Sequence, residues 1–128
     1  MTKRTDVVIV GASIAGCTAA RLLAQQGAQV TLVEKRPDPD AYKVVCTHYI
    51  QPSAMPAIRR LGLDGPLEAA GARPAMIDIW TSAGWARWQD TGYHGYNVRR
   101  SVLDPMLRHM TVETPGVEYL GGRTVTGL

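Results

Sequence analysis

Three stretches near the N-terminus have the hydrophobic patterns of a strand, a helix and a second strand. Val7–Val10 is a continuous β-branched run, which predicts a central parallel strand covered on both faces. In residues 14–26 the apolar positions recur at the spacing of one helix face, and Gly27 follows where a helix end favours glycine. Residues 30–33 form the second apolar run. Together they predict a right-handed βαβ unit.

The chain then departs from a regular α/β alternation. Where a third strand and helix would be expected, four prolines occur among polar residues: Pro37, Pro39, Pro52 and Pro56. They predict an ordered or lid-like loop rather than another parallel strand. Short helices are expected over residues 53–61 and 63–70, each followed by a glycine.

The remaining residues predict a hairpin, a helix and one or two strands. Residues 76–80 and 85–88 flank a turn that contains Gly84, which is typical of a β-hairpin, with three tryptophans on it. Residues 96–100 are extended and lead into a helix over residues 101–110. Residues 117–120 read as a strand, and residues 123–127 as the start of another.

Composition excludes several classes of protein. The chain has 128 residues, 45% hydrophobic and 20% charged, which suits one globular domain. No apolar run approaches the roughly 20 residues that span a bilayer, and no basic stripe with interleaved aromatics indicates nucleic-acid binding. Two cysteines, Cys17 and Cys46, give no disulfide framework. We expect a cytoplasmic protein without a membrane span, a nucleic-acid partner or a metal site.

The turn between the first strand and the helix carries the candidate chemistry. In the pattern G-x-G-x-x-G, the three glycines allow a tight turn, close approach of a phosphate and close helix–strand packing. Here Gly11, Ser13 and Gly16 occupy these positions, and the small Ser13 can donate its hydroxyl to a phosphate oxygen. The helix N-terminus adds unpaired N–H groups and partial positive charge. This sequence predicts a dinucleotide-binding turn.

Glu34 and an arginine before the later helix indicate which dinucleotide the turn binds. An acid at the end of the second strand accepts hydrogen bonds from ribose hydroxyls and repels a 2′-phosphate, so FAD or NAD is favoured over NADP. Lys35 and Arg36 follow directly and could approach a phosphate or lie in solvent. An arginine before a helix that packs through Leu103 and Leu107 could reach a pyrophosphate or ribityl chain, which shifts the balance to FAD.

These motifs, in this order, resemble the FAD-dependent monooxygenase superfamily. The stretches are D-V-V-I-V-G-A-S-I-A-G, V-E-K-R, L-G-L and V-R-R-S-V-L-D. The superfamily includes aromatic hydroxylases of the para-hydroxybenzoate hydroxylase type, flavin halogenases and geranylgeranyl reductases. The resemblance implies an α/β fold, a Rossmann-like FAD-binding βαβ unit with a β-hairpin insertion, incomplete at its C-terminus. Residues 1–128 would form the N-terminal part of an FAD-binding domain, with a substrate-side sheet starting at about residues 74–98.

The resemblance also assigns cofactor-binding residues. It places the turn at the FAD pyrophosphate, Glu34 on the adenosine ribose, Arg36 beside the adenine or ribose, Arg100 on the phosphates or ribityl chain, and the Val125 backbone at the adenine. The expected set is Gly11, Ala12, Ser13, Ala15, Gly16, Glu34, Lys35, Arg36, Arg100 and Val125. Lys43 and Cys46 fall where reductase-like members carry a lysine and a cysteine near the flavin. No catalytic residue is assigned, because the cofactor performs the difficult step.

The function implied by the resemblance is NAD(P)H- and dioxygen-dependent oxygenation of a small organic substrate, with aromatic substrates among those that the superfamily takes. A later G-D motif, whose aspartate holds the ribityl chain, is absent from these 128 residues. A C-terminal portion or a complementary chain is therefore expected as partner. The alternatives are an FAD-dependent halogenase or reductase fragment, a non-catalytic nucleotide-binding module that complements a partner chain, and an NAD-dependent dehydrogenase domain. The proline-rich loop argues against the last.

Overall fold

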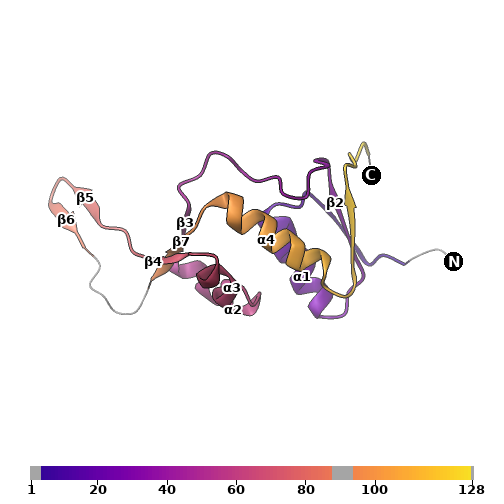
Figure 1. The fold of residues 1–128 in the computed structure, drawn as a ribbon, viewed down its shortest axis with the longest axis horizontal. Helices are drawn as coiled ribbons and strands as arrows, with labels where there is room; N and C mark the ends of the chain where they lie inside the picture. The colour runs from indigo at the N-terminus through magenta and orange to yellow at the C-terminus, as the bar shows by residue number, and fades with distance from the viewer. Residues whose placement is uncertain (1–3, 88–93, 128) are drawn as a thin grey trace. The chain divides into compact units, whose positions relative to one another are not determined.

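The computed structural model describes residues 4–87 and 94–127, which divide into two compact units (Figure 1). The first unit combines Met1–Val44 with Arg100–Leu128, and the second is Val45–Arg99. Each unit is described by itself below. In the described part of the chain, no helix is both long and apolar enough to cross a bilayer.

A parallel three-stranded sheet forms the base of the first unit. Its strands are β1 (Val7–Val10), β2 (Val30–Glu34) and β8 (Val117–Gly121), in the order β1-β2-β8. Val7 pairs with Val30, and Val30 pairs with Val117, so the three strands start level with one another. Glu34 therefore lies at the carboxyl edge of the sheet, where ligands of open α/β sheets bind.

Two helices pack on each other in this unit, α1 (Ile14–Gln25) and α4 (Arg100–Val112). Figure 1 shows α1 and α4 running alongside each other. The predicted βαβ unit is confirmed, and Gly27, at φ +92°, ends α1 with its N–H on the Ala24 carbonyl. The core is formed by small and branched side chains from the helices and β2: Cys17, Ala20, Ala24, Val30, Leu32, Leu103 and Leu107.

One expectation for this unit is wrong, and another stays a prediction. In the described sheet β1 pairs with β2 alone, and the side chains of Val8 and Val10 are 58% and 63% exposed, so the covering of β1 on both faces stays a prediction. The β8 strand adds beside β2 instead of β1, and a β-branched run cannot by itself distinguish a half-covered strand from a fully covered one. Residues 123–127 form no strand. Gly122, at φ +67°, ends β8. The N–H of Arg123 donates to the Glu34 carbonyl, and the residues that follow Arg123 are irregular.

The second unit contains a small antiparallel sheet, short helices and a hairpin. Its sheet has the order β3-β7-β4, from β3 (Tyr49–Ile50), β7 (Gly95–Asn97) and β4 (Arg73–Ala75). The helical segments are η1 (Pro52–Ala54), α2 (Met55–Arg60) and α3 (Asp64–Ala69). The core consists of Met55, Ile58, Leu61, Leu63, Leu67, Tyr96 and Val98. The proline-rich stretch that follows Glu34 was predicted to be a loop and not a parallel strand. The next strand along the chain, β3, pairs antiparallel, in agreement with this prediction.

The predicted hairpin is present but shorter than expected. It consists of β5 (Ile79–Thr81) and β6 (Gly84–Ala86). Trp80 and Trp85 lie on the same face, 65% and 57% exposed, with ring centroids 5.2 Å apart in an edge-to-face arrangement. Trp88 falls outside the described residues. The tryptophans that are described therefore pack on the hairpin face and not in a core.

Candidate functional site

The backbone between β1 and α1 forms the tight turn that the glycine pattern predicts. Gly11 has φ +101°, which a residue with a side chain rarely adopts, and its N–H donates to the Val33 carbonyl at 2.7 Å. Ser13 caps α1 with an extended backbone, and its side chain makes no capping hydrogen bond. The first turn of α1 contains no acidic residue. The positive end of the helix dipole is thus not neutralised by its own sequence.

Gly16 allows α1 to lie directly against this turn. A Cβ atom built on Gly16 would lie 1.8 Å from the Gly11 carbonyl oxygen and 3.4 Å from Ile9 Cγ2. Any side chain here would push the helix from the strand. The third glycine of the pattern therefore has the helix–strand packing function that was assigned to it.

Glu34 joins the end of β2 to the turn. Its Oε2 accepts the Ala12 N–H at 2.7 Å, and its Oε1 accepts the Arg36 N–H at 2.9 Å. Partial burial acts to raise the pKa of Glu34. The backbone hydrogen bonds from Arg36 and Ala12, with the charges of Arg108 and Arg36, outweigh burial and hold this pKa below its usual value. Glu34 is therefore an ionised acceptor at neutral pH.

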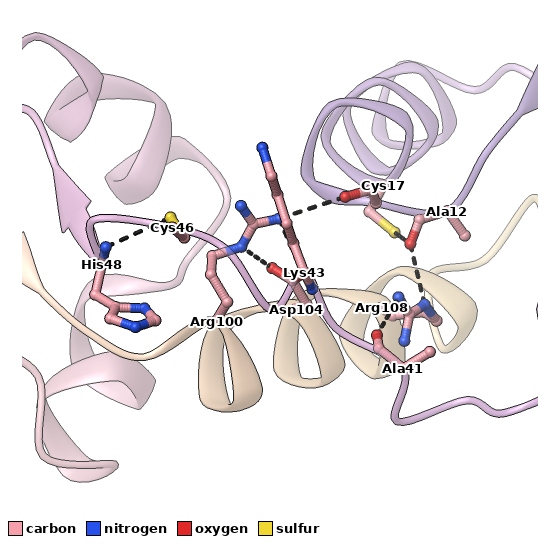
Figure 2. Close-up of polar contacts among 10 residues, drawn as sticks. Ala12, Cys17, Ala41, Lys43, Cys46, His48, Arg100, Asp104 and Arg108 are labelled. Carbon is pink, nitrogen blue, oxygen red and sulfur yellow. Dashed lines mark hydrogen bonds and ion pairs between the residues drawn. The ribbon is translucent and has the colours of Figure 1, made fainter.

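Arg100 approaches the same turn from the first residue of α4. It is 8% exposed, and its Nε and Nη2 bind the two carboxylate oxygens of Asp104 at 2.5 and 2.9 Å. Nη2 also lies 3.4 Å from Ser13 Oγ. Asp104 accepts the Lys43 N–H at 3.0 Å as well, so the carboxylate fixes both the arginine and the adjoining loop (Figure 2). The fork of Arg100 is thus held beside the helix N-terminus.

Two residues of this site, Asp104 and Arg108, were not predicted. Arg108 is 4% exposed, and it donates from Nε to the Ala12 carbonyl at 3.0 Å and from Nη2 to the Ala41 carbonyl at 2.8 Å. Arg100, Asp104 and Arg108 follow one another at four-residue spacing. This spacing places all three on one helix face, the face that also carries Leu103 and Leu107. The spacing is visible in the sequence and could have predicted that Asp104 and Arg108 belong to the site.

The other expected residues differ in how close they come to the turn. Ala15 is exposed on the first turn of α1, and Lys35 and Arg36 are exposed after β2. Val125 is 39% exposed in the irregular segment after β8, whose first residues bond to the backbone of residues 34–36. The structure brings together Gly11, Ala12, Ser13, Gly16, Glu34 and Arg100. No hydrogen bond of the described residues ties Val125 to them.

This arrangement fits the ADP half of a dinucleotide. A helix N-terminus without an acid, beside the buried cations Arg100 and Arg108, suits a pyrophosphate. The Glu34 carboxylate at the strand end has two oxygens and therefore retains acceptor capacity for ribose hydroxyls in addition to its two N–H bonds. The fold and the site define the chain as an α/β dinucleotide-binding protein.

Comparison with known proteins identifies the family. The FAD binding domain family matches residues 4–128, so the chain belongs to this family. The expected family and the expected cofactor, FAD, are confirmed.

Curated relatives include monooxygenases and a halogenase. The chain is 33% identical over 128 residues to tryptophan 2-halogenase from Chondromyces crocatus, which covers 97% of this chain and 24% of the relative. It is 31% identical over 85 residues to 6-hydroxynicotinate 3-monooxygenase from Pseudomonas fluorescens, covering 66% of this chain and 21% of the relative. The chain thus spans about a quarter or less of the length of these relatives.

Solved structures show the same fold. The flavin-dependent brominase Bmp2 superposes with a TM-score of 0.75 at 28% identity, covering 91% of this chain and 29% of the brominase. PqsL of Pseudomonas aeruginosa, in complex with 2-aminobenzoylacetate, gives a TM-score of 0.76 at 20% identity, covering 94% of this chain and 34% of PqsL. The Rossmann-like α/β class is confirmed.

Proposed function

We propose that the chain is the FAD-binding portion of a flavin-dependent monooxygenase that uses NAD(P)H and dioxygen to oxygenate a small organic substrate in the cytoplasm. One observation carries the proposal. Hydrogen bonds connect the turn to the end of β2 and to the start of α4: Ala12 donates to Glu34, and Arg100 donates to Ser13. These bonds place a helix N-terminus, a carboxylate and a buried arginine around one position, as the ADP half of FAD requires.

Each part of this site would hold a different part of FAD. The pyrophosphate would lie at Gly11, Ala12, Ser13, Ala15 and Gly16. Arg100 would donate to a phosphate oxygen, and Glu34 would accept the ribose hydroxyls. The exposed Lys35 and Arg36, and Val125 beyond β8, would border the adenosine. Hydride acceptance and oxygen activation are supplied by the flavin when it is bound, while this chain binds and orients it.

The second unit contains a cavity that we assign to the substrate. A cavity of about 350 Å³ is lined by Tyr49, Gln51, Pro52, Ser53, Met76, Ile77 and Ile79. Most of these side chains are apolar, with Tyr49, Gln51 and Ser53 available for polar contacts, which is the usual composition of a small-molecule site. We assign it, together with the strands of residues 74–98, to the apolar part of the organic substrate. Met76→Glu would then raise KM for that substrate and leave FAD affinity unchanged.

A halogenase is the second candidate. The match to tryptophan 2-halogenase runs over 128 residues, and the brominase Bmp2 superposes at 28% identity. The site for the ADP half of FAD is compatible with either activity, because both a monooxygenase and a flavin-dependent halogenase need bound FAD.

Two measurements test the proposal. FAD and NAD are first titrated into the protein, and tighter binding of NAD than of FAD would overturn the FAD assignment. Oxygen uptake and product mass are then followed for this chain completed by the expected C-terminal portion or complementary chain, with NADPH and a panel of aromatic acids and amines, with and without chloride or bromide. A monooxygenase gives products heavier by one oxygen atom in either medium. Products that form only with halide and carry it would identify a halogenase instead.

A further inference from the structure

We propose that Arg108 is a positioning residue for nucleotide binding, which holds the Ala12–Ser13 peptide so that its N–H faces the pyrophosphate and adds buried positive charge beneath the turn. This inference rests on the proposed function, because it concerns how the same site binds its ligand.

The first argument is the orientation of one peptide unit. The Ala12 carbonyl accepts from Arg108 Nε at 3.0 Å and from Cys17 Sγ at 3.3 Å (Figure 2). In a planar trans peptide the C=O and the following N–H point in opposite directions. The N–H of Ser13 therefore points away from Arg108. It belongs to the group of N–H donors at a helix N-terminus that have no partner within the helix. If this peptide were reversed, a carbonyl would face the anion.

The second argument is charge. Arg108 is 4% exposed, and its acceptors are the carbonyls of Ala12, Pro39 and Ala41. Among the residues that the structure describes, no carboxylate forms a salt bridge with it. Burying a cation has a large desolvation cost, which these carbonyl dipoles and the charge of the nearby Glu34 carboxylate oppose. An anion bound at the turn would offset more, so this cation favours a bound pyrophosphate without touching it.

The third argument is that the same guanidinium holds the loop after β2. Its two terminal nitrogens donate to Pro39 and Ala41, while Asp104, one turn earlier on α4, accepts the Lys43 N–H. Three acceptors in different directions suit the planar fork of arginine, and a lysine ammonium cannot reach all three from one point. Arg108 therefore joins the turn and the loop to one helix.

A matched control is provided by Arg21. It bridges the same two helices, donating from Nη1 on α1 to the Met110 carbonyl at 2.6 Å and to Thr114 Oγ at 2.7 Å on and just after α4. Its bonds resemble those of Arg108 in kind but lie away from the turn. A merely structural role predicts similar effects of Arg108→Met and Arg21→Met. A positioning role predicts that only Arg108→Met weakens nucleotide binding.

The experiment is calorimetric titration of ADP and of FAD into the 128-residue wild type and its Arg108→Met, Arg108→Lys and Arg21→Met variants. We expect the Kd for ADP to rise about tenfold or more in Arg108→Met, since a hydrogen bond from a charged donor and a buried charge are lost together. Arg108→Lys, which keeps the charge, should fall between, and Arg21→Met should stay within about twofold. In amide hydrogen exchange, the N–H of Ala12 should exchange faster in Arg108→Met than in Arg21→Met.

The outcomes separate the two proposals. If the wild type binds neither ADP nor FAD, the proposed function fails and this inference fails with it. If the wild type binds both and Arg108→Met binds ADP within twofold of it, only the inference is overturned. Should circular dichroism show Arg108→Met to be unfolded, Arg108→Lys decides, because wild-type affinity in that variant would show that the fork is not needed.

Discussion

Replacing Gly16 by alanine tests most sharply how α1 is seated on the turn. The added methyl group would lie 1.8 Å from the Gly11 carbonyl oxygen, and real Cβ atoms essentially never show contacts below 3.0 Å. The helix or the turn must therefore move by at least 1.2 Å, the difference between these two distances. The obstacle is backbone, so no side-chain rotation can relieve it.

The cost follows from the kind of contact. Overpacking that forces backbone shifts costs up to about 3 kcal/mol. Compared with glycine, alanine has a lower conformational entropy in the unfolded chain and a better helix propensity, which together offset about 1 kcal/mol of this cost. The net loss of about 2 kcal/mol corresponds to a fall in Tm of roughly 5–10 °C for a chain of this size. Because the movement displaces the N–H groups at the helix N-terminus, the affinity for FAD should fall by about tenfold or more.

The assay is thermal unfolding followed by circular dichroism, together with FAD titration. Gly65→Ala in α3 is the control, since a Cβ there meets nothing within 4 Å apart from its chain neighbours. Because Pro66 follows, alanine should be slightly unfavourable there, and we expect a small fall in Tm with FAD affinity unchanged. A Gly16→Ala variant with the Tm and FAD affinity of the wild type would refute the argument that this glycine is required for helix–strand packing.

Three further predictions concern titratable groups. The pKa of Glu34 is lowered in the folded state. Its contribution to stability is therefore complete above about pH 4.5, the ordinary pKa of a glutamate, and is lost as the pH falls through the pKa of the folded state. Urea unfolding between pH 6 and 3 should therefore lose stability more steeply in the wild type than in Glu34→Gln. Burial raises the pKa of Cys17 to about 11, so at pH 8 a thiol reagent should modify the half-buried Cys46 first, and two equally fast phases would contradict this. The hydrogen bond from Tyr96 to Glu68 raises the tyrosine pKa to about 12, from 10.0. Stability should fall from about pH 10 to 12, and Tyr96→Phe should remove that part of the fall.

The sequence predicted what local pattern determines. The strand, helix and strand up to Glu34 were expected because their periodicities, and the glycine that ends the helix, act within a few residues. The same pattern could not show that β8 pairs with β2 and leaves β1 at the edge of the described sheet. Strand order depends on contacts between residues more than eighty positions apart, and these have no local signature.

The site was predictable in part for the same reason. Gly16 and Glu34 belong to a spacing with a known mechanical purpose, and the structure places both at the turn. Asp104 could have been found from its spacing to Arg100, because charged residues four apart on a helix interact. The role of Arg108 depends on the carbonyls it binds, and every residue has a carbonyl. Only the folded backbone shows which carbonyls are near.

The measurement that tests the central claim most directly is a comparison of FAD, ADP and FMN as ligands of this chain. The described site surrounds the position of a pyrophosphate and a ribose, so FAD should bind and ADP should compete with it. FMN keeps one phosphate but lacks the adenosine monophosphate half, so it should bind far more weakly. Binding of FMN as tight as that of FAD, with no competition by ADP, would contradict the assignment of the Gly11–Gly16 turn and Glu34 to the ADP half of the cofactor.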